Sequence, residues 1–348
     1  MQVLQARIAR GAVFAVFVAL SLLLSVFAST PMAQAAPATV FTNPRIAQKV
    51  TLPQTSIDGP ALWTSATGDI RAEIAYTGTD PAHRLNVMTS ADGIHYGDKH
   101  ILSETSFARP ALVRLGSGSG DSIALAWTGT DRSHRLNVLV GNPGHGYTKL
   151  TLNQMSFTAP SLAMNGGYLY LAWTGTDANH SLNVARIVWR GGMYLDKKVT
   201  LWSLHSPTRP SLTYDPNADQ FLLSWVVAGT NRITFATAKD GLSYTVATAS
   251  PLPQWSYSGP HMIGLPVNNM PRYFYAWTGT DTQRSLNAQF TESFPRWPDV
   301  AATQTTFGEQ ALGGPALGYV GAANRALLAS TGTDAAHHLN IAVLSVGQ

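Results

Sequence analysis

Polar side chains that could bind or cleave a ligand recur just before a repeated proline in this 348-residue chain. A guanidinium donates a planar pair of hydrogen bonds, so two arginines can hold one carboxylate or sulfate from two sides. We therefore predict a ligand-binding site in a central channel, and an acidic sugar would suit its arginines. The alternative is that the arginines are solvated rim charges. The residues of this predicted site are Asp58, Arg109, Arg209 and Tyr257.

Hydrolysis of a glycosidic bond requires a different set of groups, two carboxyl groups about 5 to 9 Å apart. Asp58 could pair with Glu104 or Glu309, which stand slightly further from their prolines. Tyr257 is a fourth catalytic candidate. Nothing in the spacing selects one pair, so the sequence leaves catalysis open.

Several equivalent sites are the second possibility, because a histidine follows the aspartate of a repeated Gly-Thr-Asp by three residues. Each histidine could contribute to a sugar site between neighbouring repeats, or it could cap its turn through a hydrogen bond to the aspartate. One histidine per repeat does not reach the ligand count of a zinc site, so we expect no metal. No glycine-rich phosphate loop opens a helix, so we expect no other cofactor. The histidines are His83, His134, His180 and His337, and Arg284 replaces them in the fifth repeat.

The elements that position these residues are short strands in six repeats of about 50 residues. Within a repeat, apolar residues alternate with polar or small ones over five to seven positions, which is the period of strands. Four antiparallel strands in each of six repeats predict an all-β fold, the six-bladed β-propeller. Gly-Thr-Asp then joins the second strand to the third, and we expect its glycine to supply a positive φ. The repeats open near Pro60, Pro110, Pro160, Pro210, Pro260 and Pro315.

Residues 1–35 read as a signal peptide, since Arg7 and Arg10 precede an apolar run that ends in the small-x-small site Ala33-Gln34-Ala35. Residues 36–348 then form a single exported propeller domain. The sixth repeat lacks its fourth strand, whereas residues 47–53 match a fourth strand ahead of the first repeat. We expect this segment to complete the sixth blade, which leaves the ring without an unpaired edge.

The composition excludes several classes of function. The chain has no cysteines, so it has neither a disulfide framework nor a thiolate metal site. After removal of the signal peptide, 21 basic residues stand against 19 acidic ones, a net charge of +2, and no basic run suggests nucleic acid. No later stretch is apolar enough to span a bilayer. We expect a monomer that contacts no membrane after the signal peptide is cleaved.

Two stretches resemble a known motif. "SADGIHY" from Ser90 and "AKDGLSY" from Ala238 resemble the Asp box of sialidases and related glycosidase propellers. In that family the box is a folding element away from the active site, so the resemblance implies structural roles for Asp92 and Asp240. The mature chain is also similar to secreted bacterial propellers with a "WTGTD...LNV" repeat. The family's Arg-Ile-Pro motif is absent, because the first repeat opens "SIDGPAL", and this counts against hydrolysis of sialic acid.

Three functions follow from these observations. The first is lectin-like recognition of carbohydrate without catalysis. The second is glycoside hydrolysis of the sialidase-like class, and the third is a protein-binding scaffold. The expected partner for the first is an extracellular glycan.

Overall fold

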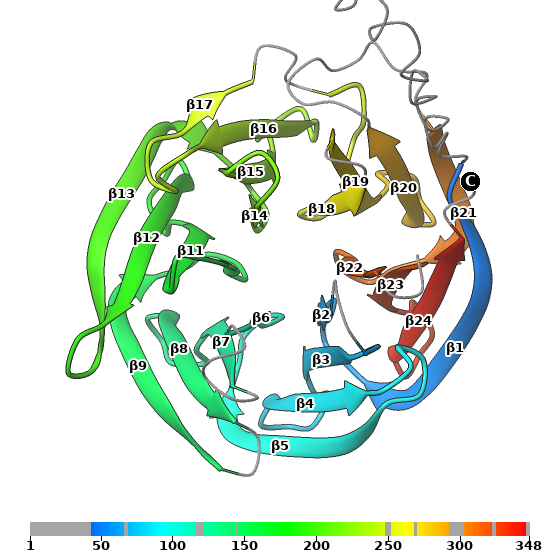
Figure 1. Cartoon of the computed structure of the whole chain (residues 1–348), viewed down its shortest axis with the longest axis horizontal. Coiled ribbons are helices and arrows are strands. Elements are labelled where there is room, and N and C mark those ends of the chain that lie inside the picture. Colours follow the sequence, from blue (N-terminus) through cyan, green and yellow to red (C-terminus); the bar gives the residue numbers. More distant parts are fainter. Residues whose placement is uncertain are drawn as a thin grey trace, which may run out of the picture. The chain divides into compact units, whose positions relative to one another are not determined.

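The computed structural model describes residues 43–65, 69–115, 122–142, 145–247, 252–267, 270–291, 303–321 and 325–345. The expected signal peptide, residues 1–35, lies outside these ranges. The described residues form six four-stranded antiparallel sheets around one axis, which confirms the six-bladed propeller (Figure 1). In this part of the chain, no helix has the length and apolarity that a membrane crossing requires.

Each of the first five blades consists of four consecutive strands, which follow one another from the axis outward. Blade 1 contains β2 (Ala61–Thr64), β3 (Ala72–Thr77), β4 (Arg84–Ser90) and β5 (Gly97–Thr105). Blade 2 contains β6 (Ala111–Arg114), β7 (Ile123–Thr128), β8 (Arg135–Asn142) and β9 (Gly146–Met155). Blade 3 contains β10 (Ser161–Asn165), β11 (Tyr168–Thr174), β12 (Ser181–Trp189) and β13 (Met193–His205). Blade 4 contains β14 (Ser211–Asp215), β15 (Gln220–Val226), β16 (Ile233–Ala238) and β17 (Thr245–Val246). Blade 5 contains β18 (His261–Val267), β19 (Met270–Thr278), β20 (Ser285–Thr291) and β21 (Thr303–Gln310).

The sixth blade combines strands from both ends of the described chain. Its three inner strands are β22 (Ala316–Val320), β23 (Arg325–Thr331) and β24 (His338–Ser345), and its outermost strand is β1 (Arg45–Thr55). Strand β1 runs antiparallel to β24, with Val50 opposite Ile341. Strand β24 therefore has a hydrogen-bonded neighbour on each side.

The hydrophobic core lies between neighbouring blades. One cluster joins Leu62 and Ile74 of blade 1 to Leu327 of blade 6, and the second strands such as β7 are buried along their whole length. The aromatic residues at the ends of these strands fill the space between blades, since Trp127 and Trp173 are buried. Burial of one large apolar side chain contributes about 1.5 to 3 kcal/mol, so packing between blades stabilises a ring that has no disulfides.

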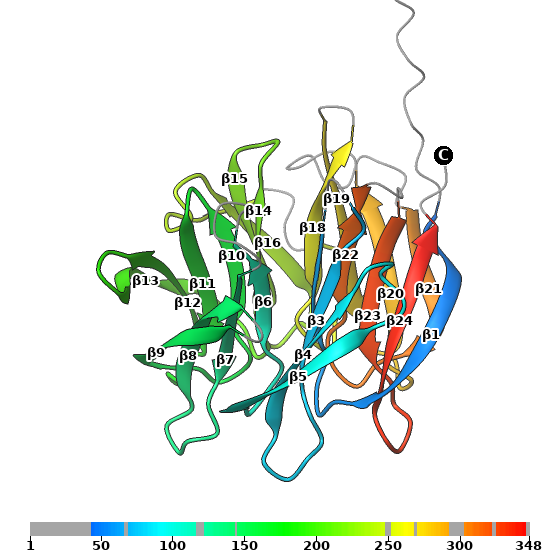
Figure 2. The same cartoon turned by 60° about the horizontal axis from the view of Figure 1, so that its bottom comes forward.

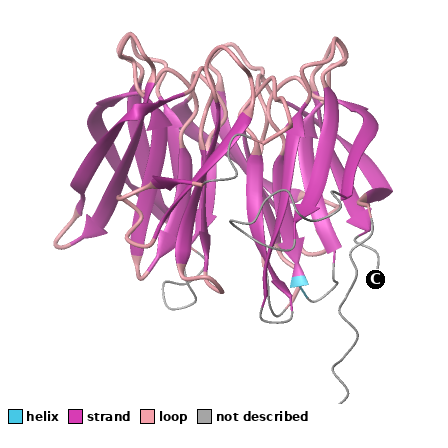
Figure 3. Cartoon of the chain, turned by 90° about the horizontal axis from the view of Figure 1, so that it is seen from above, coloured by secondary structure: helices cyan, strands magenta, loops and turns pink. Residues whose placement is uncertain are grey.

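Two kinds of connection meet on one face of the ring. They are the turns between second and third strands and the connections from an outer strand to the next blade. Ser106, in the connection that leaves β5, donates its backbone N–H to the carbonyl of His83 in the β3–β4 turn (3.0 Å). Its neighbour Phe107 donates to the carbonyl of Thr128 in the next blade (2.9 Å). We call this the turn face; Figures 2 and 3 show the ring obliquely and from the side, with loops at both ends of the strands.

The glycine of the Gly-Thr-Asp turn is required for space, and our expectation of a positive φ is wrong. A Cβ on Gly175 would lie 2.6 Å from Oδ2 of Asp177 and 2.9 Å from Nδ2 of Asn183. The left-handed conformation falls instead on His180, whose φ is 55°. Histidine tolerates this conformation better than most side chains. The equivalent residues with positive φ are His83, His134, Arg284 and His337.

In the two Asp-Gly hairpins the aspartate side chain binds the backbone of its own turn. Oδ1 of Asp92 accepts hydrogen bonds from the backbone N–H groups of Ile94 and His95, both at 2.8 Å. Asp240 binds the two N–H groups at the equivalent positions. These hairpins join third to fourth strands, so they lie at the end of the blades opposite the turn face. They organise turns and contact none of the candidate site residues.

Candidate functional site

Arg109 lies at the axis of the ring, where the inner strands begin. It is 2% exposed. Its Nη1 donates hydrogen bonds to the carbonyl oxygens of Gly314 (2.5 Å) and Pro315 (3.3 Å), and its Nη2 donates to that of Pro60. The sequence suggested an open rim at this position. The structure instead uses the guanidinium to join blade 2 to blades 6 and 1.

Arg209 holds the same position ahead of blade 4 and is 7% exposed. Its Nε and Nη2 have no hydrogen-bond partner among the described residues. Burial lowers the pKa of Arg209 to about 10, and the nearby carboxylate of Asp58 opposes this shift. Asp58 accepts its hydrogen bonds from the backbone N–H groups of Gly59 (2.6 Å) and Arg109 (3.1 Å). The two arginine side chains are therefore packed inside the protein, while Asp58 is partly exposed.

Glycine backbones close the channel at this level. A Cβ on Gly59 would collide with the carbonyl oxygen of Gly314, and a Cβ on Gly259 would collide with that of Arg209. The end of the channel at the turn face is thus filled by main chain and arginine side chains. A sugar approaching from this face does not reach the two guanidinium groups, which is a correction to the central ligand site that we expected.

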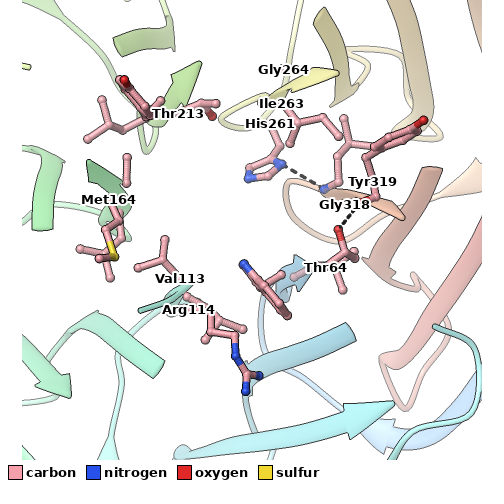
Figure 4. A pocket seen from close by; sticks show the side chains of 18 residues that line it. Thr64, Val113, Arg114, Met164, Thr213, His261, Ile263, Gly264, Gly318 and Tyr319 are labelled. Atoms are coloured by element: carbon pink, nitrogen blue, oxygen red, sulfur yellow. Dashed lines mark hydrogen bonds between the residues drawn. The ribbon is translucent and has the colours of Figure 1, made fainter. Parts of the chain in front are cut away.

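A cavity of about 330 Å³ lies inside the ring, lined by residues of all six inner strands (Figure 4). Its wall presents both polar and apolar groups and includes Trp63, Met164 and Tyr319. Arg114 also lines the cavity, but it forms an ion pair with the buried carboxylate of Glu73. No Asp or Glu is present among the described residues that line the cavity. The two facing carboxylates that a glycosidase requires are therefore missing from this described wall.

His261 stands between the cavity and the buried arginines. Its Nδ1 accepts a hydrogen bond from the N–H of Leu317 (3.0 Å), so its proton is on Nε2. Burial, together with the charges of Arg209 and Arg109, holds the pKa of His261 well below its usual value. The imidazole is therefore neutral at neutral pH.

The other candidate carboxylates lie on the outside of the ring. Glu104 of β5 forms an ion pair with Lys149 of β9, and Glu309 of β21 forms one with Lys49 of β1. Each pair joins the outer strands of two neighbouring blades. Asp58 is at the axis, so the structure does not bring it together with either glutamate, and the catalytic pairings that the sequence left open are not formed.

Each repeated histidine bonds its turn aspartate through the backbone, as the N–H of His180 does to the carbonyl of Asp177 (2.9 Å). Asp177 accepts hydrogen bonds from the backbone N–H (3.1 Å) and hydroxyl (2.9 Å) of Ser181, while no bond joins it to the side chain of His180 in the described structure. A histidine bonds the aspartate only one residue later, where Nδ1 of His338 lies 2.8 Å from Oδ1 of Asp334. The hydrogen bond from histidine to aspartate that the sequence suggested therefore runs between backbone groups, while the aspartate carboxylate binds the residue that follows the histidine.

Two of the repeated histidines, His134 and His180, stack on exposed aromatic rings from the connection into their own blade. Each stack fixes a connection against a turn on the turn face, and Tyr257 belongs to this set rather than to the buried axial residues. Around these turns and elsewhere in the described ranges, no three His, Cys, Asp or Glu residues are close enough to hold a metal ion. The stacks are Phe107 with His134 (4.3 Å between ring centroids), Phe157 with His180 (4.0 Å), and Tyr257 with Arg284 (4.1 Å from Cζ to the ring centroid).

A cleft between blades 4 and 5 has the features of a ligand site. Its volume is about 610 Å³. The indole of Trp255 lines it and is 51% exposed. The hydroxyl of Thr280 and the amides of Gln283 and Gln304 also line the cleft. An exposed aromatic surface and hydrogen-bonding groups therefore face the same space.

Trp255 occupies a position that makes a side-chain contact at three other blade boundaries. At three boundaries the last residue of the outer strand bonds the side chain of the threonine in the next Gly-Thr-Asp turn. Trp255 holds the equivalent position, opposite Arg232 of blade 4. Our sequence reasoning missed it, although comparing the six residues five positions before the repeated prolines would have revealed it. The three bonded pairs are Thr55 with Thr79 (2.6 Å), Thr105 with Thr130 (2.7 Å) and Gln310 with Thr333 (2.9 Å).

Comparison with known proteins shows a common fold. No protein-family model and no curated protein matches the sequence. The structure is similar to the Hadza microbial sialidase Hz136, with a TM-score of 0.59 and 13% identity over 82% of this chain and 65% of that chain. It is similar to an alpha-L-arabinanase of Penicillium chrysogenum (TM-score 0.56, 12% identity, 88% and 99% covered). It is also similar to the six-bladed lectin of Aleuria aurantia (TM-score 0.56, 12% identity, 86% and 99% covered). The chain is thus an all-β six-bladed propeller whose fold is similar to those of these proteins.

Proposed function

We propose that this protein is a lectin-like propeller that binds carbohydrate, without cleaving it, in the cleft between blades 4 and 5. The observation that carries the proposal is the half-exposed indole of Trp255 beside the polar groups of Thr280, Gln283 and Gln304. A sugar ring has an apolar C–H face that packs against an aromatic ring, and its hydroxyls bond to amides and hydroxyls at the edge. The similar folds of a lectin with a fucose recognition mode and of an arabinanase complexed with arabinobiose support this class of ligand.

Glycoside hydrolysis of the sialidase-like class is the alternative, and the placement of the carboxylates does not favour it. Glu104 and Glu309 form ion pairs between outer strands, while Asp58 lies at the axis. A protein-binding scaffold is the third candidate, with no specific feature in its favour. The cleft therefore supports the lectin-like candidate over the other two.

The proposed partner is an extracellular glycan, and the protein is proposed to be an exported monomer. Export rests on the signal peptide read from residues 1–35. Burial of Arg109 and Arg209 removes the reason to prefer an acidic sugar, so we assign no charge to the glycan. Protein recovered from the culture medium should begin near Ala36 when its N-terminus is sequenced.

A glycan array followed by calorimetry tests the proposal. Residues 36–348 should bind at least one glycan, and Trp255→Ala should weaken that binding by at least tenfold, which corresponds to about 1.4 kcal/mol. Trp202→Ala is the matched control, because Trp202 is 73% exposed on β13 of blade 3, away from the cleft. The control should bind as the wild type does.

Two results would contradict the proposal. One is a bound glycan whose affinity is the same for Trp255→Ala and the wild type, and the other is an array without any binding. Turnover of fluorogenic glycosides that disappears in Asp58→Ala or Glu309→Ala would establish the hydrolase instead. Capture of a protein by the wild type, with no glycan bound, would favour the scaffold.

A further inference from the structure

The buried charges at the closed end of the channel do not balance. Two buried guanidinium groups, those of Arg109 and Arg209, lie near one carboxylate, that of the partly exposed Asp58. His261 adds no charge of its own, since it is neutral. One positive charge is therefore left in a region shielded from water, and an uncompensated buried charge is strongly unfavourable.

The same region contains several buried donors without a partner. Among the described residues, no partner is found for Nε of Arg109, Nε and Nη2 of Arg209, or the hydroxyls of Ser211 and Ser258. Ser258 lies close to both arginines. A Cβ on Gly314 would lie 3.1 Å from the Ser258 hydroxyl and 3.3 Å from Nη1 of Arg109, and a Cβ on Gly259, the next residue after Ser258, would lie 2.5 Å from Cγ of Arg209. Ser211 is two residues from Arg209 at the start of β14. Buried donors in folded proteins almost always bind an acceptor. These donors have none among the described residues, which indicates that an acceptor is missing.

We infer that a small inorganic anion of the chloride class binds at the axis, against Nε and Nη2 of Arg209 and the neighbouring serine hydroxyls. An anion accepts hydrogen bonds from all of these donors and also balances the remaining charge, whereas a water molecule supplies acceptors without charge. The glycine backbones packed around Arg209 favour a monatomic anion over a sugar carboxylate. The site is separate from the cleft between blades 4 and 5 and does not depend on carbohydrate binding.

Such an anion would join the connections that precede blades 2, 4 and 5, which carry Arg109, Arg209 and Ser258. Its binding to the folded ring alone would stabilise the fold in proportion to the logarithm of its concentration. The melting temperature should then rise by roughly 2 to 4 °C for each tenfold increase in chloride above the dissociation constant.

Thermal melting at constant ionic strength, with gluconate replaced by chloride, measures this dependence. The wild type should show it and Arg209→Met should lose it. Arg84→Met is the control, because Arg84 is an exposed residue that pairs with Asp80 on the turn face, and its chloride dependence should equal that of the wild type. If Arg209→Met does not fold, Arg209→Lys keeps the charge but loses Nε and Nη2, and should weaken the dependence.

Crystals of the wild type grown in bromide provide a direct test that needs no variant. An anomalous peak within about 3.5 Å of Nε or Nη2 of Arg209 is the expected result, since charge-assisted contacts to a halide are close. Equal melting temperatures in chloride and gluconate, together with the absence of that peak, would overturn the inference. A dependence on chloride that persists unchanged in Arg209→Met would also overturn it, because the anion would then bind elsewhere.

Discussion

Replacing Gly175 with alanine tests whether the repeated turn requires space rather than an unusual backbone conformation. Gly175 does not have a positive φ, so alanine adds no backbone strain. Its Cβ would, however, lie 2.6 Å from Oδ2 of Asp177, which forces the carboxylate to move. The carboxylate then loses hydrogen bonds from Asn179 and from the N–H and hydroxyl of Ser181. At about 0.5 to 1.5 kcal/mol for each bond, and a partly exposed site, the expected cost is about 2 kcal/mol.

Urea unfolding of four proteins measures the cost and its cause. The set is the wild type, Gly175→Ala, Asp177→Ala and the double variant. Because the clash is with the carboxylate, the two changes should be non-additive by about 1 kcal/mol. Gly97→Ala is the matched control, since Gly97 has no positive φ and a Cβ there would meet nothing within 4 Å. The reasoning fails if the two effects simply add, or if Gly175→Ala is as mild as Gly97→Ala.

Two further predictions concern pH and the outer strand of blade 6. Burial alone would raise the pKa of Asp177, but hydrogen bonds from Ser181 and Asn179 lower it below its usual value. The stability that this carboxylate contributes is complete above the unfolded pKa of about 3.9 and is lost as pH falls through the lower folded pKa. The difference in melting temperature between the wild type and Asp177→Asn should therefore shrink from pH 6 to about pH 2.5; a constant difference would contradict this. A chain that starts at Ser56 lacks β1 and exposes the edge of β24, so it should melt at least roughly 5 °C below a control chain that starts at Asn43, and should aggregate in light scattering. Equal melting of the two chains would show that β1 does not stabilise the ring.

The strands, their number per repeat and the six-bladed ring could all be predicted from the amino-acid sequence. These features are local or repeated: alternation of apolar residues specifies a strand wherever it occurs, and six copies of one unit specify six blades. Local pattern also identified the turns, but not why their residues are needed. A glycine that provides φ and a glycine that provides space look the same in sequence. The distinction at Gly175 depends on Asn183, which lies across the hairpin.

The burial and the hydrogen-bond partners of the polar candidates depend on the tertiary structure. Arg109 stands before its proline as an ordinary polar residue, yet its guanidinium bonds Gly314, which is 205 positions away, because six connections converge at the axis. Trp255 is a candidate site residue for the opposite reason. It holds a position where three other copies form a polar side-chain contact, and its ring stays exposed beside a cleft. Burial is a property of the closed ring as a whole. Residues at the same position of different repeats therefore have similar backbone conformations. The packing of neighbouring side chains determines which of them are exposed to solvent.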